Sequence, residues 1–212
     1  MTAFLRFAFH HFYTTFAWTY DGVAMLVSFG EWQAWGRAAL TQVPSGARVL
    51  ELAHGPGHLH MHMREREIDV VSIDLSRQMG QLLRSRMDRM ALSYRQAQAD
   101  AQRLPFADAQ FDCVISTFPT GFIFAADTLH DVGRVLKLGG RLVIVPSIEI
   151  ASHGLTATMV RLAYRVTGQH AYSADQVQQI RHCFATAGFE FAEQHVATRH
   201  ARVTVWVCNK PM

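Results

Sequence analysis

From residue 48 to the end of the chain, short apolar runs rich in β-branched residues alternate with longer stretches in which apolar residues recur at helical spacing. Alternating strands and helices are typical of a parallel sheet that is covered by helices. The apolar runs predict seven strands, over residues 48–52, 69–73, 94–97, 111–116, 141–146, 189–196 and 202–209. The periodic stretches predict helices over residues 57–66, 78–90, 125–135 and 174–187. We therefore expect an α/β fold with a seven-stranded, mostly parallel sheet, helices on both faces and an antiparallel hairpin at the C-terminus.

Glycine, proline and serine residues mark the ends of several of these elements. A turn at residues 44–46, Pro-Ser-Gly, leads into the first strand. Ser173 is a typical N-cap for the helix that follows it, and Gly188 is expected to end that helix. The helix over residues 125–135 is expected to stop at residues 138–140, Leu-Gly-Gly, where a glycine can take the left-handed C-terminal conformation.

The two segments that do not follow this pattern are the start of the chain and a stretch after the fifth strand. Phe and Trp residues crowd residues 1–43 at helical spacing, so we expect a helical cap over the site there and one α/β domain over residues 44–212. Plain packing of helices on the sheet is the alternative explanation for most of these aromatic residues. Residues 148–172 are expected to form an insert that acts as a lid.

Composition narrows the class of protein. Half of the 212 residues are hydrophobic and 17% are charged, which excludes a disordered chain. The net charge of +3 is scattered, so no nucleic-acid partner is expected. No charge-free run reaches the ~18–20 residues of a membrane span, although the aromatic start leaves peripheral membrane contact open. The three cysteines form no CxxC pair, and no signal peptide is recognisable, so we expect a cytoplasmic protein.

The segment with the clearest chemistry is VLELAHGPGHL, residues 49–59. A buried strand ends near Glu51, and Gly55 and Gly57 would let the backbone approach a ligand closely. Ligands of open parallel sheets bind beyond the carboxyl ends of the strands, where this turn lies. A dinucleotide fingerprint, G-x-G-x-x-G, would need a third glycine where this chain has His60, which weakens that hypothesis. A nucleoside ligand without phosphates is the alternative.

Glu51, Ala53, Gly55 and Gly57 follow the pattern acid-x-Gly-x-Gly-x-Gly, with alanine at the first glycine position. In this the chain resembles the class I S-adenosylmethionine-dependent methyltransferases, in particular the group that includes the quinone-ring and sterol C-methyltransferases. Segments similar to further motifs of that family follow in the same order, at residues 73–76, 100–106, 111–116 and 134–140. The resemblance covers about residues 49–146 and implies a Rossmann-like fold with S-adenosylmethionine as cofactor.

The resemblance also implies roles for single residues. Asp74 would accept hydrogen bonds from both ribose hydroxyls, Leu75 and Met79 would flank the adenine, and Asp100 with the N–H of Ala101 would read the adenine edge. The full set expected to bind the cofactor is Tyr20, Glu51, Ala53, Gly55, Gly57, Asp74, Leu75, Met79, Asp100, Ala101 and Thr117. Simpler explanations stay open for the three acids: Asp74 as a helix cap, Glu51 as the partner of an arginine, and Asp100 as a turn residue.

Methyl transfer is an in-line displacement, so the main task of an enzyme is to position the two reactants. A base is needed only where the acceptor loses a proton. His54 is the candidate for that role, with a histidine bonded to the backbone of the turn as the alternative. Phe118, Phe122 and His153 are expected to contact the substrate, and the apolar surroundings predict a small hydrophobic acceptor.

The sequence leaves three functions open. The first is methylation of carbon or oxygen on such an acceptor. The others are an NAD-linked oxidoreductase and a protein that binds S-adenosylmethionine without turnover. His58 and His62 are four residues apart on one helix, but no third ligand accompanies them, so no metal site is expected.

Overall fold

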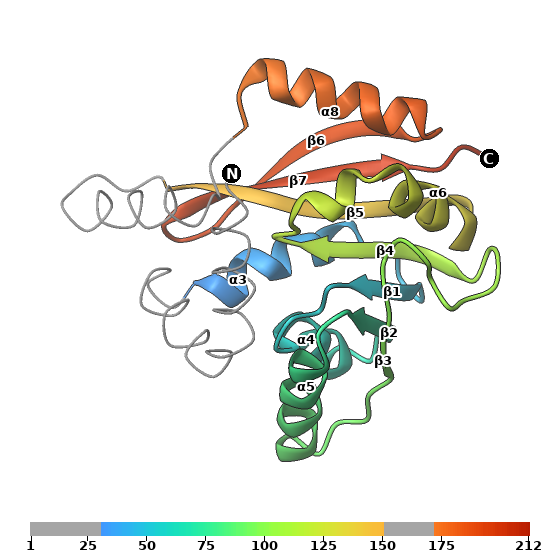
Figure 1. Cartoon of the computed structure of the whole chain (residues 1–212). Helices are drawn as coiled ribbons and strands as arrows, with labels where there is room; N and C mark the ends of the chain where they lie inside the picture. Colours follow the sequence, from blue (N-terminus) through green and yellow to red (C-terminus); the bar gives the residue numbers. More distant parts are fainter. Residues whose placement is uncertain (1–30, 151–171) are drawn as a thin grey trace, which may run out of the picture.

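The computed structural model describes residues 31–150 and 172–212, and all seven expected strands lie in one sheet (Figure 1). The strand order is β3-β2-β1-β4-β5-β7-β6. The strands are β1 (Arg48–Leu52), β2 (Asp69–Asp74), β3 (Gln96–Gln98), β4 (Phe111–Thr117), β5 (Leu136–Ile150), β6 (Glu190–Ala197) and β7 (Ala201–Asn209). The first five strands are parallel, and β7 runs antiparallel between β5 and β6. This confirms the predicted mixed sheet with its C-terminal hairpin.

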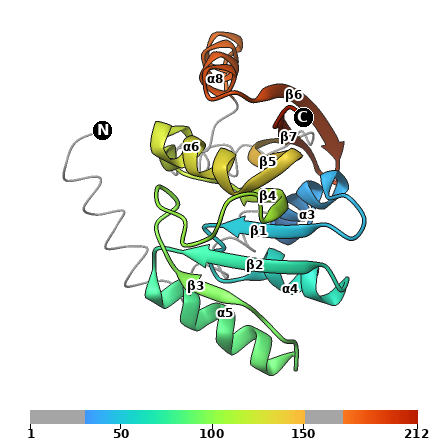
Figure 2. The same ribbon diagram turned by 90° about the vertical axis from the view of Figure 1, so that its right-hand side faces the viewer.

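Helices cover both faces of the sheet, as expected. The α-helices are α3 (Trp32–Arg37), α4 (His58–Glu65), α5 (Arg77–Arg89), α6 (Ala126–Val135) and α8 (Ala174–Thr186), and the 3-10 helices are η1 (Ala38–Gln42) and η2 (Gly121–Phe124). Figure 2 shows α3 and α4 on one side of the sheet and α6 and α8 on the other. None of the helices in the described part of the chain is long and apolar enough to cross a membrane.

The core is divided in two by the sheet because successive strand residues point to opposite faces. Val49 packs in the cluster on the α3 and α4 side, and its neighbour Leu50 packs in the cluster on the α6 and α8 side. All residues of β1 after Arg48 are buried. The central strands therefore have no solvated face, as is usual where helices cover both sides of a parallel sheet.

Two predicted boundaries after β4 are wrong. The chain passes from α6 directly into β5 at Leu136, five residues before the expected start of that strand. Gly139 has the expected positive φ of 70°, but it lies within β5 near an irregularity in the pairing with β4 rather than at a helix end. At its other end β5 continues through residues 148–150, which pair with β7 and so belong to the sheet instead of the expected insert.

Other local expectations are confirmed. Ser173 caps α8 through a capping box with Gln176, and Gly188 follows the helix with φ 83°. Residues 32–42 are helical, and their role as part of a cap over the site stays a prediction. The rest of the expected cap, with Tyr20, and the expected lid, with His153, lie outside the described residues.

Candidate functional site

The order of the strands places a candidate ligand site at one edge of the sheet. From β1 the chain builds outward through β2 and β3, then returns to add β4 and β5 on the other side of β1. The arrowheads of β1, β2 and β4 lie at the same edge in Figure 1. Ligands of doubly wound sheets bind at the point where the strand order reverses, beyond the carboxyl ends of the strands. Here that point lies between β1 and β4.

The loop between β1 and α4 occupies this point and has an unusual backbone. Three of its residues have positive φ: Ala53 at 53°, Gly55 at 54° and Gly57 at 81°. Gly57 is also the N-cap residue of α4. Hydrogen bonds from His54 N–H to the carbonyl of Ile73, 3.2 Å, and from Gly57 N–H to the carbonyl of His54, 3.0 Å, fix the turn. Ala53 therefore adopts the conformation of a glycine at the position where the resembled pattern has one, at a steric cost of about 1–2 kcal/mol.

Asp74, the last residue of β2, binds this loop directly. Its Oδ2 accepts a hydrogen bond from the N–H of Gly55, 2.9 Å, and its Oδ1 accepts one from the N–H of Ser76, 2.8 Å. Asp74 is not the cap of α5, because the side chain of Ser76 accepts from the N–H of Met79 in that role. Each carboxylate oxygen has two lone pairs, so both can accept a further hydrogen bond. A partly buried carboxylate with this remaining capacity fits a vicinal diol.

The two glycines of the loop are needed for different reasons. A Cβ at Gly55 would meet no atom within 4 Å, so the space beside it is open, as expected for a backbone that a ligand approaches. A Cβ at Gly57 would lie 2.7 Å from Cγ and 3.1 Å from Cα of Leu83. Independently of any ligand, Gly57 therefore allows the loop to pack against α5.

Glu51, in β1 two residues before the loop, is 2% exposed. Its Oε2 accepts a hydrogen bond from the hydroxyl of Ser72 at 2.6 Å, and that hydroxyl lies 2.5 Å from Nδ1 of His60. Glu51 and Ser72 are directly opposite each other in the pairing of β1 with β2. Among residues 31–150 and 172–212, no arginine forms the ion pair with Glu51 that was the expected alternative.

The residues expected around the adenine lie along the same rim. Leu75 is 67% exposed, whereas Met79 is 6% exposed. Asp100 is exposed, and its Oδ1 accepts a hydrogen bond from the N–H of Gln102 at 2.9 Å, while Ala101 lies between them in the turn. Asp100 thus has the turn geometry of the simpler explanation, with its side chain still accessible to solvent. An exposed leucine beside Asp74 is an apolar surface on which a base can stack.

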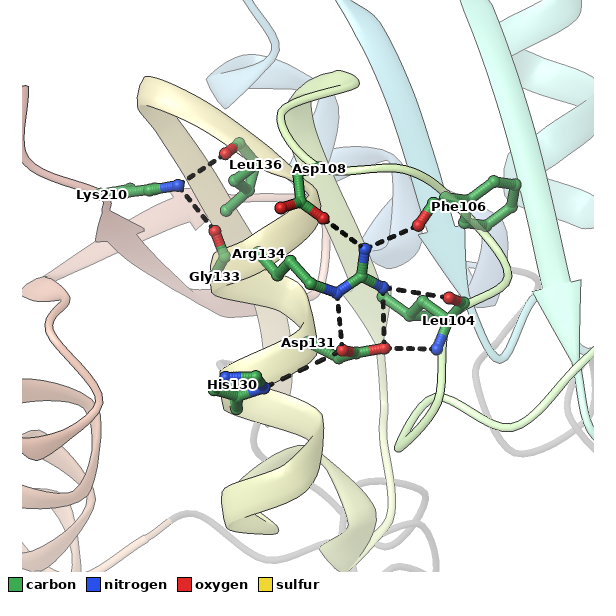
Figure 3. Close-up of polar contacts among 9 residues, drawn as sticks. All are labelled: Leu104, Phe106, Asp108, His130, Asp131, Gly133, Arg134, Leu136 and Lys210. Atoms are coloured by element: carbon green, nitrogen blue, oxygen red, sulfur yellow. Dashed lines mark hydrogen bonds and ion pairs between the residues drawn. The ribbon is translucent and has the colours of Figure 1, made fainter.

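The segment after Asp100 is attached to α6 by Arg134 (Figure 3). The guanidinium of Arg134 binds Asp131 and Asp108 and donates to the carbonyls of Leu104 and Phe106 at 3.1 and 2.7 Å. Asp131 in turn accepts from the N–H of Leu104 at 2.5 Å. The hydrogen bonds from Arg134 lower the pKa of Asp131 below its usual value. These contacts hold residues 104–108 in one conformation.

Two aromatic rings meet beyond the end of β4. Phe118 follows the last residue of β4, Thr117, and stacks on Trp32 of α3 with ring centroids 4.4 Å apart. Phe118 has φ 49°, which is strained for a bulky side chain. Phe122 is partly buried and packs against the core cluster on the other face of the sheet, and its expected contact with the substrate stays a prediction. The structure therefore brings Phe118 together with Trp32 and not with Phe122.

The histidines of this region differ in their contacts. Nδ1 of His54 lies 2.6 Å from the carbonyl of Gly55, so it carries the proton, and the buried Nε2 has no hydrogen-bond partner. Nε2 of His62 contacts Arg37 and Gln33, and its Nδ1 contacts Glu65. Both ring nitrogens of His62 are thus used within the protein. Within residues 31–150 and 172–212, no three potential ligands gather as they would around a metal ion.

Sequence reasoning missed the two partners that connect to Glu51 and the pairing of Phe118 with Trp32. Ser72 is a lone hydroxyl inside an apolar strand, and His60 lies on the inward face of α4, where a polar residue is unusual. Both residues stand out in the sequence as polar positions among apolar ones. The register of β1 with β2 places Ser72 opposite Glu51, and the packing of α4 brings His60 to Ser72. Trp32 was expected in the cap, yet no sequence pattern pairs it with Phe118.

Comparison with known proteins gives the following similarities. A family described as "Methyltransferase domain" matches residues 49–140. The demethylmenaquinone methyltransferase of Deinococcus radiodurans is 35% identical over 153 residues, which are 69% of this chain and 62% of that protein. The ubiquinone/menaquinone biosynthesis C-methyltransferase UbiE of Escherichia coli O1:K1 / APEC is 30% identical over 182 residues, 80% of this chain and 72% of that protein. The chain therefore spans less than two thirds of the Deinococcus relative.

A solved structure agrees with the fold. It is that of a putative S-adenosyl-L-methionine-dependent methyltransferase from Methanococcus maripaludis, which superposes with a TM-score of 0.67 and covers 92% of each chain at 13% identity. An identity this low supports the architecture alone.

Proposed function

Because the chain belongs to the class I S-adenosylmethionine-dependent methyltransferases, we propose that it transfers a methyl group from S-adenosylmethionine to a small hydrophobic acceptor. The single observation that carries the proposal is the position of Asp74. Its carboxylate lies at the end of β2, orders the loop after β1 through Gly55, and keeps acceptor capacity for a ribose diol. We assign the adenosine end of the cofactor to the rim formed by Asp74, Leu75 and Asp100, and its amino-acid end to Glu51.

The residues present fit this cofactor. Open space beside Gly55 admits a ligand against the backbone, and the exposed Leu75 provides an apolar face for the base. When bound, S-adenosylmethionine supplies a methyl group on a sulfonium, which departs to a nucleophile while its bonding electron pair stays on sulfur. The chain supplies orientation and exclusion of water, which account for most of the acceleration expected for such a displacement.

The acceptor site is assigned to the region beyond β4. The stacked rings of Trp32 and Phe118 form an apolar wall beside the end of that strand. An aromatic wall favours a planar, apolar acceptor, and the similar proteins of Deinococcus radiodurans and Escherichia coli are named for methylation in quinone biosynthesis. We therefore propose a ring carbon or oxygen of a quinone-like compound as the position that is methylated.

His54 is the proposed base where the acceptor must lose a proton. Because Nδ1 donates to the carbonyl of Gly55, the lone pair is on Nε2, and that atom is buried without a partner. A carbon nucleophile on an activated ring would give up its proton to this atom after or during methyl transfer. Tyr20, Thr117, Phe122 and His153 remain predicted contacts of the cofactor or the acceptor.

Two alternatives are separated by experiment. Purified protein is incubated with methyl-labelled S-adenosylmethionine and a panel of demethylated quinones and phenols, and the label is followed into the organic phase. Transfer that is abolished by S-adenosylhomocysteine supports the proposal. Binding of S-adenosylhomocysteine without transfer to any acceptor would favour a non-catalytic binding protein. A rise in melting temperature with NAD but not with S-adenosylhomocysteine would favour an oxidoreductase.

A further inference from the structure

A chain of three buried polar side chains joins β1 and α4, the elements on either side of the proposed cofactor loop, through β2. Glu51 of β1, Ser72 of β2 and His60 of α4 are 2%, 0% and 0% exposed. The hydroxyl of Ser72 donates to Oε2 of Glu51 at 2.6 Å, and Nδ1 of His60 lies 2.5 Å from that hydroxyl. Three elements that meet only in the folded protein thus contribute one side chain each.

The protons of this chain can be assigned from its geometry. Ser72 has one proton, which it gives to Glu51, so its oxygen must accept from Nδ1–H of His60. The other ring nitrogen of His60, Nε2, is buried and has no hydrogen-bond partner. A proton on that nitrogen would be buried without an acceptor, so the tautomer with the proton on Nδ1 is favoured.

This assignment leaves Glu51 as a buried carboxylate without a cation. In the described part of the chain no lysine or arginine pairs with it, and Nδ1 of His60, 3.7 Å from its Oε2, is engaged with the hydroxyl of Ser72. An isolated buried carboxylate is strongly disfavoured, so a cationic group that reaches it gains a large electrostatic interaction. The ammonium of an α-amino acid is such a group, and Glu51 lies two residues before the loop that begins at Ala53.

We infer that His60 and Ser72 are positioning residues that orient the carboxylate of Glu51 toward the ammonium group of the amino-acid end of the cofactor. The inference rests on the proposed function, since it takes S-adenosylmethionine as the ligand. Ser72 and His60 occupy Oε2 and hold the carboxylate in one orientation, which leaves the rest of its acceptor capacity for the ammonium. The two residues contact neither ribose nor adenine in this assignment, so their effect is restricted to the amino-acid end.

The test compares two ligands that differ only at that end. S-adenosylhomocysteine carries the amino-acid group, whereas 5′-methylthioadenosine has the same adenosine and sulfur without it. Dissociation constants are measured by calorimetry for the wild type and for Ser72→Ala, His60→Leu and Glu51→Gln. We expect each substitution to raise the dissociation constant of S-adenosylhomocysteine about tenfold. The dissociation constant of 5′-methylthioadenosine should change less than about twofold. His60→Asn, whose amide N–H takes the place of Nδ1–H, should retain most of the wild-type affinity.

Matched controls distinguish the possible failures. Asp74→Asn should lower the affinity for both ligands, because Asp74 is assigned to the adenosine that they share. The inference would be overturned if Ser72→Ala and His60→Leu lost affinity equally for both ligands, or if neither variant lost affinity for S-adenosylhomocysteine. Either result would leave the proposed function intact. Failure of the wild type to bind either ligand would overturn the proposed function itself. Should His60→Leu not fold, Ser72→Ala gives the same comparison with a smaller change in volume.

Discussion

The carboxylate of Asp74 accepts a hydrogen bond from the backbone N–H of Gly55 at 2.9 Å, and this contact joins the end of β2 to the loop after β1. The same carboxylate accepts from Ser76 at the start of α5. Asp74 therefore sets the shape of the loop and, in the proposed function, binds the ribose. The two tasks are coupled, because the loop that approaches the cofactor is held by the residue that binds it.

Replacement of Ala53 by glycine should stabilise the protein. Ala53 has φ 53°, and glycine adopts this conformation without the steric cost that alanine has. Part of this gain is offset by the greater conformational freedom of glycine in the unfolded chain. We therefore expect the free energy of unfolding to rise by about 0.5–1 kcal/mol. Urea denaturation measures it. Ala53→Val should destabilise, because a β-branched residue is more strained there; a stabilising valine would contradict the assigned backbone.

Replacement of Gly57 by alanine should have the opposite effect. The new Cβ would lie 2.7 Å from Cγ of Leu83 in a backbone with φ 81°, so α5 must move or the turn must change. We expect a loss of about 2–4 kcal/mol in the free energy of unfolding. Gly121→Ala is the control, since a Cβ there meets nothing within 4 Å and its φ is not positive. Equal stability of the two variants would show that the loop does not pack against α5 as described.

The contacts of Arg134 predict a pH dependence of stability. Its hydrogen bonds lower the pKa of Asp131 in the folded protein, so this part of the stabilisation is complete above the unfolded value of about 3.9 and is lost as the pH falls through the lower folded value. Arg134→Gln should lower the free energy of unfolding at pH 7 by about 1.5–3 kcal/mol.

Urea denaturation at pH 7, 5 and 3.5 tests this dependence. The difference between the wild type and Arg134→Gln should persist at pH 5 and shrink below about pH 4. It should not vanish, because the bonds of Arg134 to the carbonyls of Leu104 and Phe106 do not titrate. Lys137→Gln is the control, because Lys137 forms an exposed ion pair with Asp112. This substitution should lower the free energy of unfolding by less than about 1 kcal/mol. A difference that grows with acidity would refute the assignment.

The stacked pair of Trp32 and Phe118 predicts an effect on the acceptor alone. Trp32→Ala removes the ring that lies 4.4 Å from Phe118 and should raise the KM of an aromatic acceptor roughly three- to tenfold. Trp32→Phe retains a ring and should restore most of the affinity. Calorimetry should give an unchanged affinity for S-adenosylhomocysteine in both variants, and a parallel loss of cofactor affinity would argue against a separate acceptor wall.

Much of the fold could be predicted because local signals mark its elements. β1 was predicted with its observed bounds, since a Pro-Ser-Gly turn precedes its apolar run and a glycine-containing loop follows it. The start of β5 was missed because Gly139 looked like a helix end, whereas pairing with β4 and β7 extends the strand on both sides of it. Pairing between distant strands overrides a local glycine signal.

The site could be predicted only in part for a similar reason. Asp74 ends β2, Leu75 follows it and Gly55 follows β1. These residues lie at a common edge once the sheet is parallel, so their residue types and spacing were informative. The contact of Ser72 with Glu51 depends on cross-strand register, and the contact of Phe118 with Trp32 depends on where α3 packs. Neither is encoded in short-range spacing.

In the proposed function, the rim built around Asp74 binds one molecule of S-adenosylmethionine. Calorimetric titration with S-adenosylhomocysteine tests it most directly, with Asp74→Asn as the variant and Asp88→Asn, on the exposed side of α5, as the matched control. We expect one site in the wild type, an affinity reduced about 10–100-fold in Asp74→Asn, and no change in Asp88→Asn. No heat of binding in the wild type, or equal affinity in all three proteins, would contradict it.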